Sequence, residues 1–486
     1  MYLKKRHTVA ALVGGAILSS ATFSAWAGMT PPDAREGEML SAPKDAGYDA
    51  REYSVGLEYT PGTTKMRGDV TMTAVASKPL ETIQLDYAAG AVSAVSVDGN
   101  PARSRVNGQK LKITPDNAIP EGKKFTVRVQ YTTNRSAKIK KDGEDRTAWR
   151  ESKTGFALYA QPNFARMVFP SHDHPSDKAS FTIKVTVPHG YTGIASGQLT
   201  SQIKRAGEET FTYRLAEPAA TQTIQIAAGK YTKRTADGPH GIQLNYFEPV
   251  GTPNPNMRRE LDRTTDEINW LEQRFGAYPS QSYGILAFEG DYEGALETQT
   301  LSTINASHLS ANKGPSPALL TVHELTHQWF GNHVAVSGWK DIWMSEGHAT
   351  LYEYAYPTDR GLLNDPDTGK KLDMNLTQVM REFYKGDQEV RNNYGPPAAP
   401  ISDAAIFGSS AYVGGALALY ALQEEVGEST FTKIEKEFLR TYGGKNASTD
   451  DYIHTASEVS GRDLTSFLKK WLEGTKTPPM PNHPDW

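Results

Sequence analysis

The chain has 486 residues, too many for one ordinary hydrophobic core, so two or three domains are expected. Its net charge of −4 is mild and no basic tract is present, which argues against a nucleic-acid-binding protein. Because the sequence contains no cysteine, disulfides are excluded, and any metal ion must be held by histidine and carboxylate side chains.

The first 27 residues have the three-part layout of a secretory signal peptide. A basic start, "MYLKKRH", is followed by the small and apolar "TVAALVGGAILSS", and Ala25-x-Ala27 precedes Gly28. A membrane anchor is the alternative, but the apolar stretch is short for a bilayer span. We therefore expect cleavage after Ala27, export to the periplasm or the medium, and no stable membrane insertion afterwards.

Residues 28–232 are predicted to form an antiparallel β domain. Two hairpins are expected: "VSAVSVDGN" alternates and turns at Asp98-Gly99, and "RSRVNGQKLKI" has Asn107-Gly108 between two alternating runs. The runs "FTVRVQY", "FTIKVTVP", "ETFTYRL" and "TQTIQIAAG" continue the β pattern.

Residues 233–486 are predicted to form a second, mainly helical domain, because the periodicity changes near residue 254. A helix is expected to end at Gly276, with apolar residues at helical spacing before it: Met257, Leu261, Ile268 and Leu271. "SYGILAF" predicts a short strand, and "SPALLTVHELTHQWF" predicts a helix capped by Ser316. Further helices are expected in "AYVGGALALYALQEEVG", "TFTKIEKEFLRTYG" and "STDDYIHTASEVSG", with loops near 355–367 and 395–410.

The helix predicted in "SPALLTVHELTHQWF" contains His323-Glu324-x-x-His327. This spacing places both imidazoles on one face, with Glu324 beside them. Such a match alone is weak, since two histidines can be a structural pair. Glu346 follows His327 by nineteen residues, a spacing that suits a second helix packed against the first. Two histidines and one glutamate leave a fourth position for water, which is the arrangement of a catalytic zinc site with one ion per chain.

Four segments together resemble the aminopeptidase N family, the zinc gluzincins that include leukotriene-A hydrolase. "HELTHQWFGN" and "WMSEGHA" resemble its zinc motifs, with Ser345 where Asn is common. "YEGALET" resembles the Gly-x-Met-Glu-Asn exopeptidase motif, except for Thr298 at the last position. "AYVGGALALYAL" resembles the segment of the catalytic tyrosine, with Gly414 where Lys is usual, and "QPNFARMVFPSHDHPSDKA" resembles a β-domain segment that reaches into the site. The resemblance covers about residues 50–475.

The resemblance implies an α+β fold, in which an antiparallel β saddle precedes a thermolysin-like, mainly helical zinc peptidase domain. It also implies roles for individual residues. Glu324 would take a proton from the attacking water, and Tyr412 would donate a hydrogen bond to the oxyanion. Glu297 would bind the α-ammonium of the substrate. The zinc ligands would be His323, His327 and Glu346, and further substrate contacts would come from Gly294, Ala295 and Gln161.

Three readings remain open at this point. The first is an exported zinc aminopeptidase that acts on peptides with a free N-terminus. Only 140 residues follow Glu346, so we expect a short member without the family's C-terminal helical domain. The second is a zinc endopeptidase, which has no need of Glu297. The third is a metal-free peptide-binding protein with a decayed site.

Asp341 could orient a ligand histidine or be a solvated acid.

Overall fold

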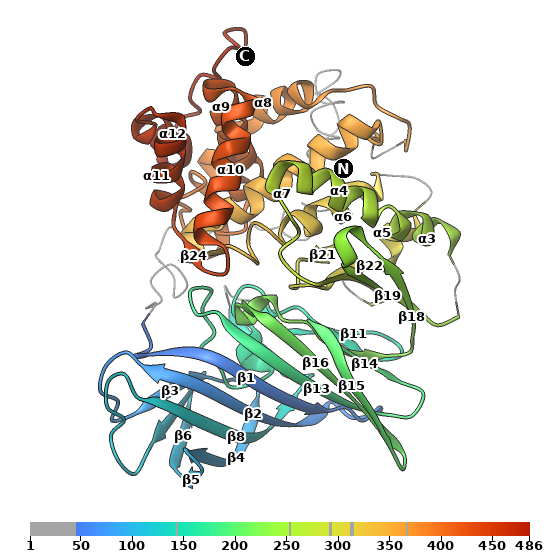
Figure 1. Ribbon diagram of the computed structural model, residues 1–486, viewed down its shortest axis with the longest axis vertical. Helices are drawn as coiled ribbons and strands as arrows, with labels where there is room; N and C mark the ends of the chain where they lie inside the picture. The colour runs from blue at the N-terminus through green and yellow to red at the C-terminus, as the bar shows by residue number, and fades with distance from the viewer. Residues whose placement is uncertain (1–44, 142–143, 252–253, 291–293, 312–314, 366–367) are drawn as a thin grey trace, which may run out of the picture.

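The computed structural model describes residues 45–141, 144–251, 254–290, 294–311, 315–365 and 368–486. The predicted signal peptide lies outside these residues. Figure 1 shows a β-rich lobe, coloured blue to green, below a helical lobe coloured yellow-green to red. Within the described ranges, the helices are all too short or too polar to cross a membrane.

The β-rich lobe is built on an eight-stranded sheet in the order β15-β16-β13-β1-β2-β8-β4-β5. Buried and more exposed residues alternate along β8, as expected for a sheet with one face on the core. Neighbouring strands are antiparallel except β1 and β13, which are parallel, so the predicted antiparallel domain has one exception. The strands are β1 (Tyr48–Glu58), β2 (Lys65–Ala76), β4 (Gly90–Val97), β5 (Asn100–Pro101), β8 (Lys124–Asn134), β13 (Ala179–Pro188), β15 (Gln198–Arg205) and β16 (Glu208–Ala219).

Smaller sheets complete this lobe, and both predicted hairpins are confirmed. Val97 pairs with Asn100 in one hairpin, and Asn107 pairs with Lys110 in the other. The remaining strands are β3 (Ile83–Asp86), β6 (Arg103–Asn107), β7 (Lys110–Thr114), β9 (Ile139–Lys141), β10 (Glu144–Arg146), β11 (Trp149–Glu151), β12 (Phe156–Leu158), β14 (Thr192–Ala195) and β17 (Ile226–Gly229). Short 3-10 turns lie at Ala165–Met167, Thr221–Thr223 and Pro239–Gly241.

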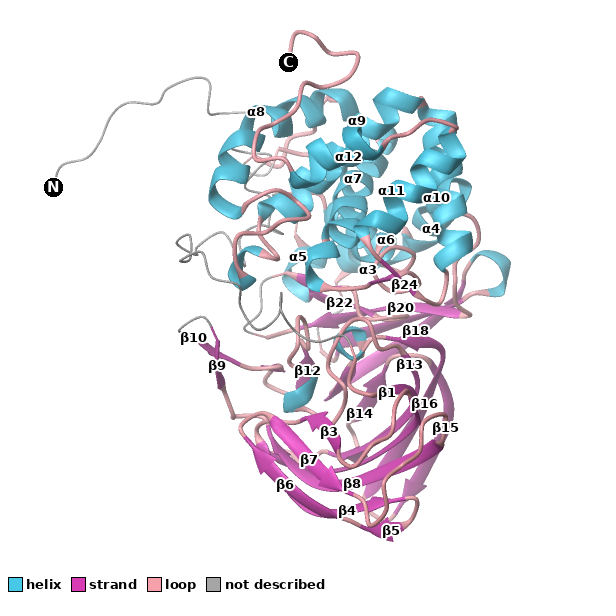
Figure 2. Ribbon diagram, turned by 90° about the vertical axis from the view of Figure 1, so that its left-hand side faces the viewer, coloured by secondary structure: helices cyan, strands magenta, loops and turns pink. Residues whose placement is uncertain are grey.

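A five-stranded sheet in the order β18-β19-β20-β22-β21 lies at the base of the helical lobe (Figure 2). Its strands are β18 (Tyr231–Asp237), β19 (Gln243–Pro249), β20 (Ser282–Phe288), β21 (Ala295–Leu296) and β22 (Ser302–Asn305). The predicted domain boundary between residues 232 and 233 falls inside β18. Every residue of β20 is buried, because this central strand is covered on both faces.

The helical lobe contains ten described α-helices and one two-stranded sheet. They are α3 (Pro255–Asp262), α4 (Thr264–Phe275), α5 (Ala306–Ser310), α6 (Pro317–Thr326), α7 (Trp343–Arg360), α8 (Leu376–Tyr394), α9 (Gly415–Val426), α10 (Glu428–Tyr442), α11 (Thr449–Ser460) and α12 (Thr465–Glu473), with β23 (Ala335–Val336) pairing with β24 (Asn446–Ala447). The helix predicted before Gly276 is divided at Arg263 into α3 and α4. Short 3-10 turns lie at Trp339–Asp341 and Asp403–Ala405.

Two helical segments were not predicted. α7 continues to Arg360 through part of the predicted loop at 355–367, with Pro357 in its last turn. α8 was missed because its buried stripe changes from apolar to charged after Phe383. The next buried positions are Asp387 and Arg391, which form a fully buried ion pair at 2.6 Å. Charged residues at buried positions break the apolar periodicity from which a helix is predicted.

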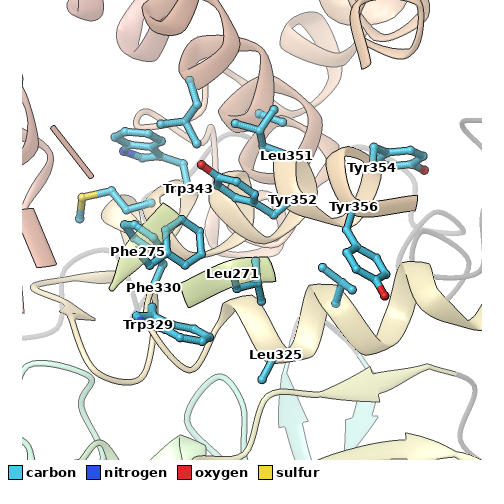
Figure 3. Close-up of a cluster of buried hydrophobic side chains, with 14 of the residues drawn as sticks. Leu271, Phe275, Leu325, Trp329, Phe330, Trp343, Leu351, Tyr352, Tyr354 and Tyr356 are labelled. Atoms are coloured by element: carbon cyan, nitrogen blue, oxygen red, sulfur yellow. The ribbon is translucent and has the colours of Figure 1, made fainter. Parts of the chain in front are cut away.

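An aromatic cluster fixes α6 against α7 and α4 (Figure 3). The rings of Phe275 and Tyr352 meet edge to face with centroids 4.6 Å apart, and Phe275 also contacts Phe330 and Trp329. Such edge-to-face pairs favour defined ring orientations. The two helices on which the predicted metal ligands lie are therefore held by a rigid core.

Candidate active site

Helix α6 presents His323, Glu324 and His327 together. Ser316 caps the helix as predicted, because its hydroxyl oxygen accepts the N–H of Ala318. His327 closes the helix and its N–H donates to the carbonyl of His323, so the two imidazoles lie one turn apart. Their ring centroids are 4.7 Å apart.

The first turn of α7 brings Glu346 to both histidines. Its Oε2 lies 3.5 Å from His323 Nε2 and 3.3 Å from His327 Nε2, and all three residues are buried. Ligands about 2.0–2.1 Å from a tetrahedral zinc ion lie roughly 3.3–3.4 Å from one another. These spacings and the nitrogen and oxygen donors therefore fit a zinc ion.

The charges in this cluster suit a metal ion. Burial would raise the pKa of Glu346, but the neighbouring imidazoles of His327 and His323 lower it to about 2. Burial would lower the pKa of His323, but the carboxylates of Glu346 and Glu353 raise it well above its usual value. Without a metal ion, Glu346 is ionised and His323 is protonated at neutral pH, so a bound metal ion would replace the imidazolium proton as the positive charge between the carboxylates.

Hydrogen bonds orient both imidazoles with Nε2 toward Glu346. His323 Nδ1 lies 2.9 Å from Glu353 Oε2, further along α7. His327 Nδ1 lies 2.9 Å from the hydroxyl oxygen of Ser345 and 3.2 Å from the carbonyl oxygen of Phe330. These acceptors favour the tautomer with hydrogen on Nδ1, which leaves the Nε2 lone pair for the metal.

Asp341 is fully buried, so the alternative that it is a solvated acid is wrong. Asp341 Oδ1 accepts hydrogen bonds from the backbone N–H and the hydroxyl of Thr449, at 3.0 and 2.8 Å. Glu353 contacts His323, and sequence reasoning missed it. Its spacing of seven residues from Glu346 places it on the same face of α7, a signal that could have identified it.

We predict that Glu353→Gln lowers zinc affinity about 10–100-fold, because the carboxylate that supports His323 is lost. Affinity is measured by competition with a chromogenic chelator. Asp341→Asn is the control, since the Oδ1 of this buried acid contacts Thr449 on another helix. Replacing His323, His327 or Glu346 should remove most of the metal. Equal zinc affinities in the Glu353 and Asp341 variants would contradict this assignment.

Glu324 projects an unsatisfied carboxylate oxygen beside the ligand cluster. Its Oε2 is buried and has no hydrogen-bond partner within the part of the chain that the structure describes. Burial raises the pKa of Glu324 to about 8, although the imidazoles of His323 and His327 oppose this shift. A buried carboxylate oxygen without a partner is costly, so it marks a position where water or another polar group binds.

Glu297 lies beside the same cluster and joins the two lobes. One carboxylate oxygen accepts a 2.6 Å hydrogen bond from Gln161 Nε2 of the β-rich lobe. Ligand atoms of Glu297, Glu324 and His327 all lie within 4.8 Å of one another. Burial raises the pKa of Glu297, and the imidazole of His327 opposes the shift. The predicted ammonium-binding residue is thus placed next to the predicted general base.

The segment before Glu297 forms the terminal strand of the five-stranded sheet. Gly294 has a φ of 128° and its carbonyl accepts the N–H of Asn305, and Ala295 and Leu296 then form β21 against β22. A terminal strand is the kind of edge to which an extended peptide can add. Thr298, which stands where the family has Asn, is buried and its hydroxyl donates to the carbonyl of Leu301.

Tyr412 reaches the site from a single π-helical turn, Ser410–Gly414, that precedes α9. Its ring is nearly parallel to that of His323, with centroids 6.1 Å apart. Burial raises the pKa of Tyr412 well above its usual value, and the carboxylate of Glu346 adds to the shift. The phenol therefore stays protonated and keeps a hydrogen to donate.

Glycines allow this turn to approach the zinc helices. A Cβ on Gly415 would lie 2.9 Å from the Cα of Gly347 on α7, so the two helices touch through their backbones. A Cβ on Gly414, where the family usually has Lys, would lie 3.0 Å from Cγ of Pro397. The site thus combines two histidines, four glutamates and a tyrosine from two helices, the segment after strand β21 and a π-helical turn, which defines a metallopeptidase of the His-Glu-x-x-His type.

Comparison with known proteins gives the family. Residues 259–471 match the peptidase family M1 domain, and residues 49–221 match the peptidase M1 N-terminal domain. Aminopeptidase N from Lactococcus lactis is 26% identical over 336 residues, which cover 64% of this chain and 38% of that protein. Aminopeptidase N from Streptomyces lividans is 27% identical over 322 residues, covering 64% of this chain and 37% of that protein. The chain therefore matches well under half the length of either relative.

Solved structures agree over nearly the whole chain. A variant of the M1 zinc metallopeptidase from Deinococcus radiodurans, bound to a Tyr-Ser-Ala substrate, has a TM-score of 0.79 and 29% identity, and the match covers 90% of this chain and 96% of that one. A two-domain M1 zinc metallopeptidase bound to L-arginine has a TM-score of 0.80 and 28% identity, with 92% and 100% covered. The chain belongs to peptidase family M1, and the predicted fold class is confirmed.

Proposed function

We propose that this protein is a zinc-dependent aminopeptidase that removes the N-terminal residue of peptides. The placement of Glu297 within 4.8 Å of Glu324 and His327 carries this proposal. The α-nitrogen and the carbonyl carbon of one residue are only about 2.5 Å apart by standard bond lengths. A carboxylate that binds the ammonium so close to the general base therefore selects the first peptide bond.

His323, His327 and Glu346 would hold the zinc ion. When bound, zinc polarises the scissile carbonyl and lowers the pKa of water in the site. Glu324 accepts the proton of the attacking water through its unsatisfied Oε2 and later returns it to the leaving amine. Tyr412 donates its hydroxyl hydrogen to the developing oxyanion.

Substrate is positioned by residues of both lobes. Glu297, with Gln161 on one of its oxygens, binds the α-ammonium as a charge-assisted hydrogen-bond acceptor. Ala295 begins the terminal strand β21 and Gly294 directly precedes it, so an extended substrate would lie alongside them. The similar enzyme from Deinococcus radiodurans was solved with a Tyr-Ser-Ala substrate, and this ligand supports peptides as the substrate class here.

The test is a panel of aminoacyl chromogenic substrates, each with and without an N-acetyl block. Because a charged hydrogen bond contributes about 1.5–3 kcal/mol, blocked substrates should be cleaved about 10–100-fold more slowly. Glu297→Ala should slow cleavage of the free amines while zinc stays bound. Efficient cleavage of an internal bond in an N-blocked peptide would instead identify an endopeptidase. Absence of turnover on every substrate, with no bound zinc, would favour a peptide-binding protein.

We also propose that the enzyme is exported and works in the periplasm or the medium. The basic start, the apolar stretch and the Ala25-x-Ala27 site before Gly28 support this. Mass spectrometry of protein from either compartment should show Gly28 as the first residue. An intact Met1 in the membrane fraction would show that the segment is an anchor.

A further inference from the structure

Lys178 is a partly buried lysine whose position the proposed catalytic roles do not explain. It precedes β13 in the β-rich lobe, and its Nζ donates to the carbonyls of Asn332 and His333, at 2.7 and 2.8 Å. Within the described residues, no carboxylate forms an ion pair with it. Burial lowers the pKa of Lys178 to about 7, and an amine in either protonation state retains enough hydrogens for both carbonyls.

The two carbonyls belong to the loop that follows the zinc helix. Asn332 N–H donates to the carbonyl of His327, and a Cβ on Gly331, whose φ is 119°, would lie 2.2 Å from the hydroxyl oxygen of Ser345. The loop is therefore packed against a predicted zinc ligand and against the serine that contacts it. Backbone carbonyl oxygens are hydrogen-bond acceptors, so two of them on one loop can hold the amine of Lys178.

The same loop holds the main chain of the ammonium-binding residue. The side-chain amide of Asn332 donates to the carbonyl of Glu297 at 2.6 Å, and Asn332 is almost fully buried. The β-rich lobe thus reaches Glu297 by two routes. Gln161 contacts its carboxylate directly, and Lys178 contacts the residue that holds its backbone.

We propose that Lys178 is a positioning residue for ammonium recognition, which fixes Glu297 relative to the zinc ligands through Asn332. This inference rests on the proposed function, since it requires that Glu297 binds the substrate ammonium. The position of Glu297 then depends on how the β-rich lobe packs against the helical lobe. Through this contact, the β-rich lobe contributes to the selection of substrates with a free N-terminus.

The experiment compares two inhibitors, an L-amino acid amide and the same amide without its α-amino group. In Lys178→Met, the inhibition constant of the amine should rise about tenfold, because small displacements in a site are costly, while that of the deaminated amide stays unchanged. KM for free-amine substrates should rise, and zinc should remain at about one ion per chain. If Lys178→Met does not fold, Lys178→Gln replaces it in the experiment. Because glutamine keeps an amide donor, the inhibition constant of the amine should rise by less, and that of the deaminated amide should again stay unchanged.

Two controls separate positioning from general damage. Lys233→Met removes an exposed lysine of strand β18, which lies over the ring of Phe247, and should leave both inhibition constants unchanged. Lys178→Met combined with Glu297→Gln should weaken amine binding no further than Glu297→Gln alone. Equal weakening of both inhibitors, or a loss of stability with no change in selectivity, would overturn the inference. A wild-type enzyme that does not prefer the amine would instead overturn the proposed function.

Discussion

Replacement of Glu324 by Gln should retain about one zinc ion per chain and reduce kcat by about 10²–10⁴-fold, the usual contribution of a general acid–base residue. Glutamine keeps the size of the side chain but cannot accept a proton. Under the proposed function, His323, His327 and Glu346 supply the metal ligands and Glu324 does not, so the change should leave the metal in place. Metal analysis and steady-state kinetics on the same preparation test both parts of this result.

Glu267→Gln is the matched control for this variant. Glu267 is another buried acid of the helical lobe, and burial raises its pKa to about 8, as it does for Glu324. Its carboxylate accepts a 2.7 Å hydrogen bond from Thr321 on the same helix α6. Glu267→Gln should change kcat by no more than a few-fold. Loss of zinc from Glu324→Gln would show that Glu324 is a ligand. If both variants lose turnover to a similar extent, the fall in kcat is caused by altered helix packing.

The local pattern of the sequence was sufficient for much of this site. Helical spacing placed His323 and His327 on one face, and the structure brings Glu346 to both of them as that pattern required. Hairpin turns such as Asn107-Gly108 were predictable because their backbone conformation demands particular residues.

Contacts between distant segments were less accessible to sequence reasoning. Gln161 and Glu297 are 136 residues apart in the chain, so only the family resemblance suggested that they share a site. Lys178 and Asn332 have no local pattern that links them, since their contact depends on how the two lobes pack. The buried pair Asp387 and Arg391 hid helix α8, because hydrophobic periodicity cannot represent charges that neutralise each other inside a core.

Replacement of Tyr412 by Phe should reduce kcat by about 10²–10³-fold, or roughly 2.7–4 kcal/mol, the range for loss of one oxyanion donor. The phenol is held in place by the π-helical turn, in which the hydroxyl of Ser410 donates to the carbonyl of Gly395 at 2.6 Å. Phenylalanine preserves the ring that lies parallel to His323, so zinc content and the cooperative unfolding transition should remain as in the wild type.

Tyr420→Phe provides the control on the neighbouring helix α9. The hydroxyl of Tyr420 donates to Thr377 at 3.1 Å and its ring stacks on Trp486, away from the ligand cluster. Its loss should cost only about 1 kcal/mol of stability, typical of one hydrogen bond, and leave kcat unchanged. If Tyr412→Phe keeps near-normal kcat while Tyr420→Phe also has no effect, the oxyanion is stabilised by another group. A fall in kcat together with a rise in KM would mean that the Tyr412 hydroxyl already contacts the bound substrate, because an interaction confined to the transition state lowers kcat alone.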